Sequence, residues 1–178
     1  MLALTPKILN PKPLTQQAFE PYGEVIDLRN AAKQFDINFG LATRYHDVAQ
    51  LGFDSTEADA GKLGFSLLTT QATPLPLQVR VMEYHPLGCQ LFYPMDETAF
   101  LVLVAPAAEE LDVTKLELFI TDGKQGVNYH AGTWHHYLLP LLKDNQSSAN
   151  FIIVDRIGSD KNCIETKLNE GIVITINE

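Results

Sequence analysis

The sequence predicts a mainly β protein, an antiparallel sandwich or barrel that begins with one short helix. Most of the chain divides into short segments rich in Val, Ile, Leu, Phe and Thr, separated by Gly, Pro and Asp. Such segments are typical of strands joined by turns. Little helical pattern lies between them, and many short strands without intervening helices favour an all-β architecture.

The elements follow in order along the chain. A helix is predicted over residues 16–22, because Thr15 can cap its first turn and Gly23 can end it. A further helical turn is expected at residues 108–115. No segment has the composition of a linker, so residues 1–178 are predicted to form a single domain. Strands are predicted at residues 24–28, 40–46, 63–71, 78–85, 99–104, 116–121, 126–129, 151–155 and 172–176.

Composition argues against several classes of function. Lys and Arg total 13 and Asp and Glu total 22, a net charge of −9, whereas binding to nucleic acid needs clustered cations. No run approaches the roughly 18 apolar residues of a membrane span, and the apolar run at the start is too short for a secretory signal. We therefore expect a cytoplasmic protein with no nucleic-acid or membrane partner, in which Cys89 and Cys163 are reduced thiols.

The five histidines are unevenly placed, and four of them fall in residues 82–95 and 123–136. Glu83 and His85 are two residues apart on a predicted strand, so their side chains share one face. A carboxylate and an imidazole on a buried face are costly unless they pair or bind a ligand, and histidine is suited to metal binding and proton transfer near neutral pH. The alternative is an edge strand whose Glu83 face lies in water.

The second segment joins a predicted strand to a histidine pair through a glycine-containing bend. Asn128 and His130 share one face of that strand. His135 and His136 then point to opposite sides, so at most one of them faces the pocket. We interpret His130 and His135 as functional residues and His136 as a surface or interface residue.

These residues resemble the cupin motifs. The run from His130 to His135 is similar to the second motif, Pro-x-Gly-x-x-His, with histidine in place of proline. The run Glu83-x-His85-x-x-x-x-Gln90 is similar to the first motif, His-x-His-x(3,4)-Glu, with Glu and Gln as replacements at its two ends. More specifically, the chain resembles the ureidoglycolate lyases of allantoin catabolism, in the segments at residues 35–47, 83–95, 119–136 and 154–160.

This resemblance implies a cupin-like double-stranded β-helix barrel and a homodimer. The implied reaction splits (S)-ureidoglycolate, a small anion, into glyoxylate and urea, whereas a hydrolase acting on the same substrate releases ammonia and carbon dioxide. The residues do not decide between these outcomes. Two other functions stay open: another cupin enzyme, such as a metal-dependent oxygenase or isomerase acting on a small acid, and a non-catalytic module that binds a small acid.

The elimination needs a base, an acid and a group that holds the substrate carboxylate. We expect His130 or His135 to be the base, and Glu83 or the other histidine to be its partner. With His85, these side chains are expected to line one cavity inside the barrel.

Arg44 is the predicted clamp for the substrate carboxylate, since a guanidinium can form two parallel hydrogen bonds to it. A surface arginine paired with Asp47 is equally compatible with the sequence. Gln90 and Asn128 are predicted as further substrate contacts. A divalent metal, with Ni²⁺ as the first choice, could be held by His85, His135, Glu83 and Gln90, and a metal-free site is the alternative.

Overall fold

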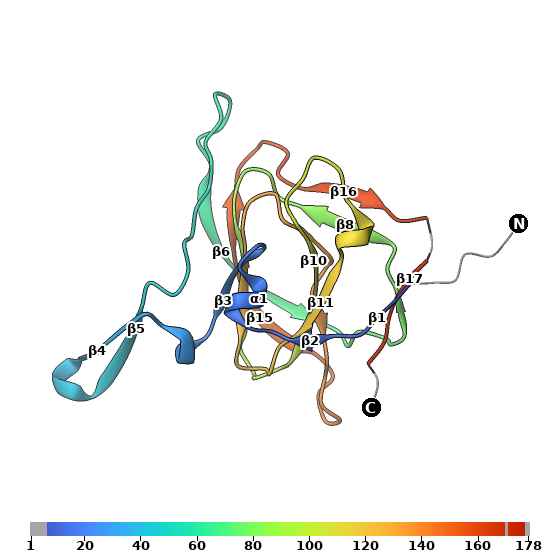
Figure 1. Ribbon diagram of the computed structural model, residues 1–178. Coiled ribbons are helices and arrows are strands. Elements are labelled where there is room, and N and C mark those ends of the chain that lie inside the picture. The colour runs from blue at the N-terminus through green and yellow to red at the C-terminus, as the bar shows by residue number, and fades with distance from the viewer. Residues whose placement is uncertain (1–6, 170, 177–178) are drawn as a thin grey trace, which may run out of the picture.

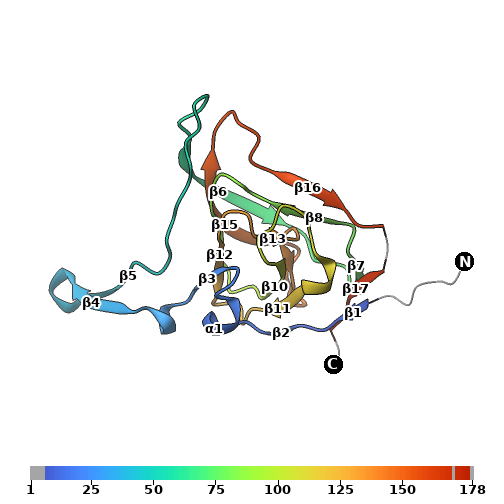
Figure 2. The same ribbon diagram turned by 45° about the horizontal axis from the view of Figure 1, so that its top comes forward.

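The computed structural model describes residues 7–169 and 171–176, and it consists of three stacked sheets and a projecting hairpin (Figures 1 and 2). The prediction of a mainly β, cupin-like fold with a short N-terminal helix is confirmed. The expectation of a closed antiparallel barrel is wrong in two respects. The strands form open sheets packed as a sandwich, and β1 (Lys7–Leu9) and β2 (Lys12–Pro13) each pair parallel with a partner strand.

A five-stranded antiparallel sheet forms the first layer. Its strands lie in the spatial order β3 (Gly23–Ile26), β12 (Gly126–Tyr129), β9 (Gln90–Pro94), β15 (Ala149–Ile157) and β6 (Lys62–Thr70). Strand β6 is at one edge and pairs with β15 along its whole length. At the other edge, Gly23 allows the main chain of β3 to lie close to that of β12, because a Cβ at this position would lie 1.9 Å from the carbonyl oxygen of Asn128.

A second sheet faces the first, and a third sheet covers the far side of the second. The third sheet consists of β1, β17 (Ile172–Ile174) and β7 (Leu77–Gln78). The second sheet runs in the order β16 (Ile164–Lys167), β8 (Val81–Tyr84), β13 (Trp134–His135), β10 (Phe100–Ala105), β11 (Glu117–Ile120) and β2, and β14 (Leu139–Pro140) also pairs with β10.

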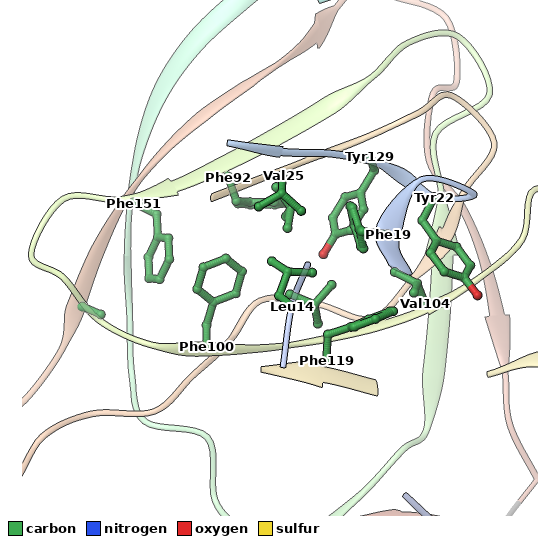
Figure 3. Close-up of a cluster of buried hydrophobic side chains, with 13 residues drawn as sticks. Leu14, Phe19, Tyr22, Val25, Phe92, Phe100, Val104, Phe119, Tyr129 and Phe151 are labelled. Atoms are coloured by element: carbon green, nitrogen blue, oxygen red, sulfur yellow. The ribbon is translucent and has the colours of Figure 1, made fainter. Parts of the chain in front are cut away.

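Strand β10 forms the centre of the molecule, because all six of its residues are buried. Its sequence, FLVLVA, is a continuous apolar run of the kind required by a strand covered on both faces. Phe100, Val102 and Val104 belong to an aromatic-rich cluster between the first two sheets (Figure 3). Leu101 and Leu103 belong to a second cluster, which packs against the third sheet. Alternation along one strand therefore supplies both cores.

The predicted helix is present but shorter than expected. Helix α1 spans Gln16–Phe19, and the Thr15 hydroxyl accepts a hydrogen bond from the N–H of Ala18 as a cap. Pro21 follows closely, and its missing N–H prevents the helical hydrogen bonds from continuing. The turn expected at residues 108–115 is a 3₁₀ segment, η3 (Val113–Lys115). The strand predicted at residues 78–85 is divided between two sheets, as β7 and β8.

A hairpin extends away from the stacked sheets in both views (Figures 1 and 2). It consists of β4 (Lys33–Ile37) and β5 (Ala42–His46), with η1 (Leu28–Asn30) before it and η2 (Asn38–Gly40) at its tip. The sequence predicted β5 but not its partner, and all residues of β4 are exposed. In the described part of the chain, no helix is long and apolar enough to cross a membrane.

Candidate active site

Three predicted site residues meet between the first two sheets. Glu83 lies on β8 and is directly opposite His135 on β13. Their strand neighbours Met82 and Trp134 point the other way, into the second core, so the period of two turns Glu83 and His135 toward the first sheet. His85 follows β8, and the three side chains offer ligand atoms that all lie within 4.8 Å of one another.

Gln90 completes this group from the facing sheet. It begins β9, and its side chain is buried. Its Oε1 lies 3.1 Å from Nε2 of His135, and the nearest oxygen of Glu83 lies 3.6 Å from the same nitrogen. The predicted convergence of Glu83, His85, Gln90 and His135 is therefore present, and we call these four residues the Glu83 cluster.

The hydrogen-bond partners of the two imidazoles fix where their lone pairs point. Nδ1 of His85 donates to the carbonyl oxygen of Asn162, and Nδ1 of His135 donates to that of Thr133 at 2.9 Å. A carbonyl only accepts, so each Nδ1 carries a proton and each Nε2 is left to act inside the cluster. Nε2 of His85 is buried without a partner among the described residues.

This arrangement places several electron-rich atoms together. If His135 is neutral, the lone pair on Nε2 faces the oxygens of Gln90 and Glu83, which is repulsive. A cation removes the repulsion, either as a second proton on His135 or as a metal ion among the four side chains. Two imidazoles, a carboxylate and an amide oxygen form a donor set that suits Ni²⁺ or Zn²⁺. The unpartnered Nε2 of His85 fits the second alternative in particular.

Burial and neighbouring charges together set the pKa values of the ionisable groups at the site. Burial raises the pKa of Glu83, but the neighbouring imidazoles of His135 and His85 outweigh it and hold the pKa below its ordinary value. Burial, reinforced by the charge of His135, lowers the pKa of His85. Burial and the nearby Glu83 carboxylate raise the pKa of the Cys163 thiol to about 11. At neutral pH Glu83 is therefore anionic, His85 is neutral and Cys163 is a thiol.

The tyrosine of β12 closes one side of the cluster. Tyr129 is buried and stacks on His135, with ring centroids 4.3 Å apart and planes inclined by 12°. Alternation along β12 directs Tyr129 inward, so Asn128 and His130 point to the outer face. The sequence interpretation chose the wrong face of this strand.

Asn162 supports the cluster from outside. Besides its carbonyl contact with His85, its Oδ1 accepts the N–H of Leu87 at 2.8 Å. The segment before Asn162 is held by Asp59, whose carboxylate accepts main-chain N–H bonds from it and lies 3.4 Å from the buried guanidinium of Arg156. The sequence did not predict a role for Asn162, because its contact with His85 is made by the main-chain carbonyl, which every residue type has. The nearest hint was the family resemblance of residues 154–160, just before it.

His130 does not join the Glu83 cluster, so the expectation of one cavity shared by all these residues is wrong for His130. Its side chain is half exposed, and its Nε2 lies 3.3 Å from Glu24. The Nδ2 of Asn128, a buried residue, donates to the other oxygen of Glu24 at 2.8 Å. His130 lines a separate surface cavity of about 330 Å³ whose other lining residues are Gln50, Gly52, Phe53, Asp54, Gly88, Cys89 and Ala131.

Arg44 also lies away from the cluster. It is an exposed residue of β5, on the projecting hairpin. The structure thus does not bring the predicted carboxylate clamp to the site within one chain. Lys161 is an exposed basic residue close to the cluster, and its positive charge partly opposes the rise in the pKa of Cys163.

The sequence is similar to those of known proteins of one family. A sequence model of the family described as ureidoglycolate lyase matches residues 6–175. The chain is 40% identical over 169 residues to a protein named ureidoglycolate lyase from Burkholderia mallei (strain NCTC 10229), covering 95% of this chain and 94% of the relative. It is 39% identical over 159 residues to one from Azotobacter vinelandii, covering 89% and 91%, and 36% identical over 166 residues to one from Pseudomonas syringae pv. syringae, covering 93% of each. The chain therefore belongs to the ureidoglycolate lyase family.

Proposed function

We propose that this protein is a ureidoglycolate lyase, which eliminates urea from (S)-ureidoglycolate and leaves glyoxylate. Membership of the family supports the substrate, and the Glu83 cluster supports the chemistry. The single observation that carries the mechanism is the 3.6 Å approach of the Glu83 carboxylate to Nε2 of His135, inside a largely buried site. An anionic oxygen and an imidazole nitrogen this close together can both reach one small substrate bound beside them and exchange protons with it.

The elimination moves one proton off the substrate and returns one to the leaving group. A base removes the proton of the carbinol hydroxyl, the C–O bond becomes a carbonyl, and the C–N bond breaks with its electron pair on the urea nitrogen. An acid then protonates that nitrogen, and no water is consumed. We assign the base to Glu83, because its lowered pKa keeps it ionised at neutral pH.

We assign the acid to His135. Protonated on both nitrogens, it donates Nδ1–H to Thr133 and can offer Nε2–H to the departing nitrogen. Tyr129 stacks on the ring and fixes its plane. Well-placed acids and bases contribute about 10²–10⁴-fold each.

As the alternative to a second proton on His135, we propose that the four side chains of the Glu83 cluster can hold a divalent ion, with Ni²⁺ as the first choice; His135 would then be a metal ligand through Nε2 and would not be the acid. Such an ion, when bound, supplies Lewis acidity that lowers the pKa of the substrate hydroxyl. The residues fit this role through the unpartnered Nε2 of His85 and the oxygens of Glu83 and Gln90. Metal content and activity, measured before and after chelation on protein purified without a histidine tag, test the proposal: full activity after complete metal removal contradicts it.

We propose Lys161 as the cation that attracts the substrate carboxylate in a single chain, in place of the distant Arg44. Lys161→Ala should raise KM with a smaller effect on kcat. Lys124→Ala serves as the matched control, because Lys124 is another exposed lysine. An unchanged KM in Lys161→Ala removes this residue from substrate binding.

We also propose that the protein is a cytoplasmic homodimer. The family resemblance supports the dimer, and the two free cysteines support the cytoplasm as its compartment.

The reaction itself is tested by incubating the protein with (S)-ureidoglycolate and measuring urea and ammonia in parallel. Urea formed without ammonia supports the lyase. Ammonia as a direct product indicates hydrolysis, and glyoxylate binding without turnover indicates a non-catalytic binding module. Glu83→Gln, which keeps the size of the side chain and removes its charge, should abolish most urea release.

A further inference from the structure

We propose that Arg156, a buried residue near the end of β15, is a positioning residue for His85. Arg156 makes no hydrogen bond or ion pair with the four residues of the Glu83 cluster, all of which the structure describes. It acts instead through the turn that carries His85. The inference rests on the proposed function only in taking the Glu83 cluster as the site.

The turn that follows His85 is held by a hydrogen bond on each side. The N–H of Leu87 donates to Oδ1 of Asn162, and the carbonyl of Leu87 accepts the N–H of Asp54, both at 2.8 Å. Gly88, the next residue, forms a β-bridge with Phe53. The position of the His85 turn therefore depends on two segments, residues 52–54 on one side and residues 158–162 on the other.

Both segments are fastened to the guanidinium of Arg156. Its Nε donates to the carbonyl of Asp54 at 2.9 Å and so holds the first segment. Its Nη2 lies 3.4 Å from Oδ2 of Asp59, and this oxygen accepts the N–H groups of Ser159 and Asp160 in the second segment. The loop between β5 and β6 and the loop between β15 and β16 accordingly lie side by side (Figures 1 and 2). One side chain thus joins the two supports of the His85 turn.

The guanidinium is enclosed as a fixed part of the structure. The side chain of Arg156 is 0% exposed, and a buried charge is tolerated only where it is paired and hydrogen-bonded. Gly61 has a φ of +62°, and a Cβ there would lie 2.6 Å from Nε of Arg156. The planar fork of arginine can hold a carbonyl and a carboxylate at fixed angles, whereas lysine offers a single nitrogen. Lysine at position 156 should therefore keep the charge and lose the geometry.

The property of His85 that depends on these contacts is its tautomer. Nδ1 of His85 donates to the carbonyl of Asn162, which leaves the lone pair on Nε2 for the Glu83 cluster. If the turn and the loop of Asn162 move apart, this hydrogen bond is lost and the proton is free to occupy Nε2. The nitrogen that faces the cluster would then be a donor and could no longer bind a metal or accept a proton.

Long-range ¹H–¹⁵N NMR of the histidine rings tests the proposal on the full chain after chelation, so that no metal selects the tautomer. His85 of the wild type is expected as the Nδ1–H tautomer. Arg156→Lys should give a mixture with the Nε2–H tautomer and bind nickel about tenfold more weakly, the scale for losing a group that orients a metal ligand. Arg29→Lys is the matched control and should behave as the wild type, because Arg29 also contacts two aspartates, each at 2.6 Å, but lies outside the site.

A purely structural role for Arg156 gives a different result. Arg156→Lys would then lower the melting temperature but leave the tautomer and the nickel affinity of the wild type, and this outcome overturns the proposal. A wild-type His85 in the Nε2–H form overturns it as well. Asp59→Asn, which keeps the size of the side chain and removes its charge, is a second variant and should shift the tautomer in the same direction; an unchanged tautomer there contradicts the proposal.

Native-state hydrogen exchange on the wild type provides a test that needs no variant to fold. If Arg156 joins the two supports, the amides of Asp54, Leu87 and Asp160 should exchange through one shared opening with the same free energy. Different free energies of opening for these three amides overturn the proposal. Neither the tautomer nor hydrogen exchange requires turnover, so a failure of the proposed lyase reaction and a failure of the positioning role are distinguishable.

Discussion

Replacing Asn162 by alanine should loosen His85 without removing any group from the Glu83 cluster. Asn162 Oδ1 accepts the N–H of Leu87 at 2.8 Å, and its carbonyl accepts Nδ1–H of His85. The substitution deletes the first bond directly and leaves a partly buried N–H without its partner, which costs about 1–3 kcal/mol. A shift of the loop that restores hydration to this N–H would carry the carbonyl away from His85.

The expected loss follows from these contacts. Removing the partner that orients a metal-binding histidine typically lowers metal affinity or activity about 10–100-fold. At about 1.4 kcal/mol per factor of ten, this range equals about 1.4–2.8 kcal/mol, which lies within the cost of the broken bond. The melting temperature should fall by only about 2–4 °C per kcal/mol in a chain of this length.

Nickel titration by calorimetry and steady-state kinetics on ureidoglycolate measure the effect. Asn145→Ala is the matched control, because Asn145 is exposed and makes no side-chain hydrogen bond among the described residues. The Asn162→Ala variant should bind nickel more weakly and show a lower kcat/KM, while the control matches the wild type. Wild-type nickel affinity together with wild-type kcat/KM in Asn162→Ala would refute the positioning role.

Four further predictions concern the site and the core. His135→Gln should lower kcat/KM at least about 100-fold, whereas His130→Gln should lower it less than tenfold, because His130 lies outside the cluster; comparable losses in steady-state assays would contradict this division of roles. Because the pKa of His85 is lowered, protonation of its ring should cause activity to fall only below about pH 6.5, and a pH–rate profile with an acidic midpoint above that value contradicts it. Because the pKa of His85 is lower in the folded state, the folded protein binds fewer protons than the unfolded one when the pH lies near or below the unfolded-state pKa of this histidine. The free energy of unfolding should therefore be highest above the unfolded-state pKa of His85 and should fall as the pH drops through its folded-state pKa. His85→Gln should flatten this part of the stability profile, measured by urea denaturation. Phe151→Ala should destabilise the fold by about 3–5 kcal/mol, since Phe151 is fully buried against Phe100, and a loss below about 1 kcal/mol would argue against the core described here.

Much of the fold could be predicted because apolar periodicity reports burial. The strand at residues 126–129 has the predicted bounds, and the one predicted at 63–71 is present as Lys62–Thr70. The open, partly parallel sheets could not be predicted, because β1 and β2 are only three and two residues long and their register depends on tertiary packing. Strand β4 was missed for a related reason: all its residues are exposed, so it has no alternation between buried and exposed positions.

The site was predictable in part. Glu83, His85 and Gln90 follow a motif, and spacing alone placed Glu83 and His85 on one face. Which face of β12 points inward was not predictable, because Asn128 and Tyr129 both end up buried, one under a loop and the other in the core. The contact between Asn162 and His85 joins residues 77 positions apart, and a main-chain acceptor has no identity that a sequence pattern could reveal.

A crystal soaked with glyoxylate shows directly where the product binds. We predict density in contact with Glu83 and His135, within reach of Nε2 of His85. Density confined to the cavity beside His130, Gln50 and Cys89, with the Glu83 cluster unoccupied, would contradict the account and move the active site to the outer face of the sheet.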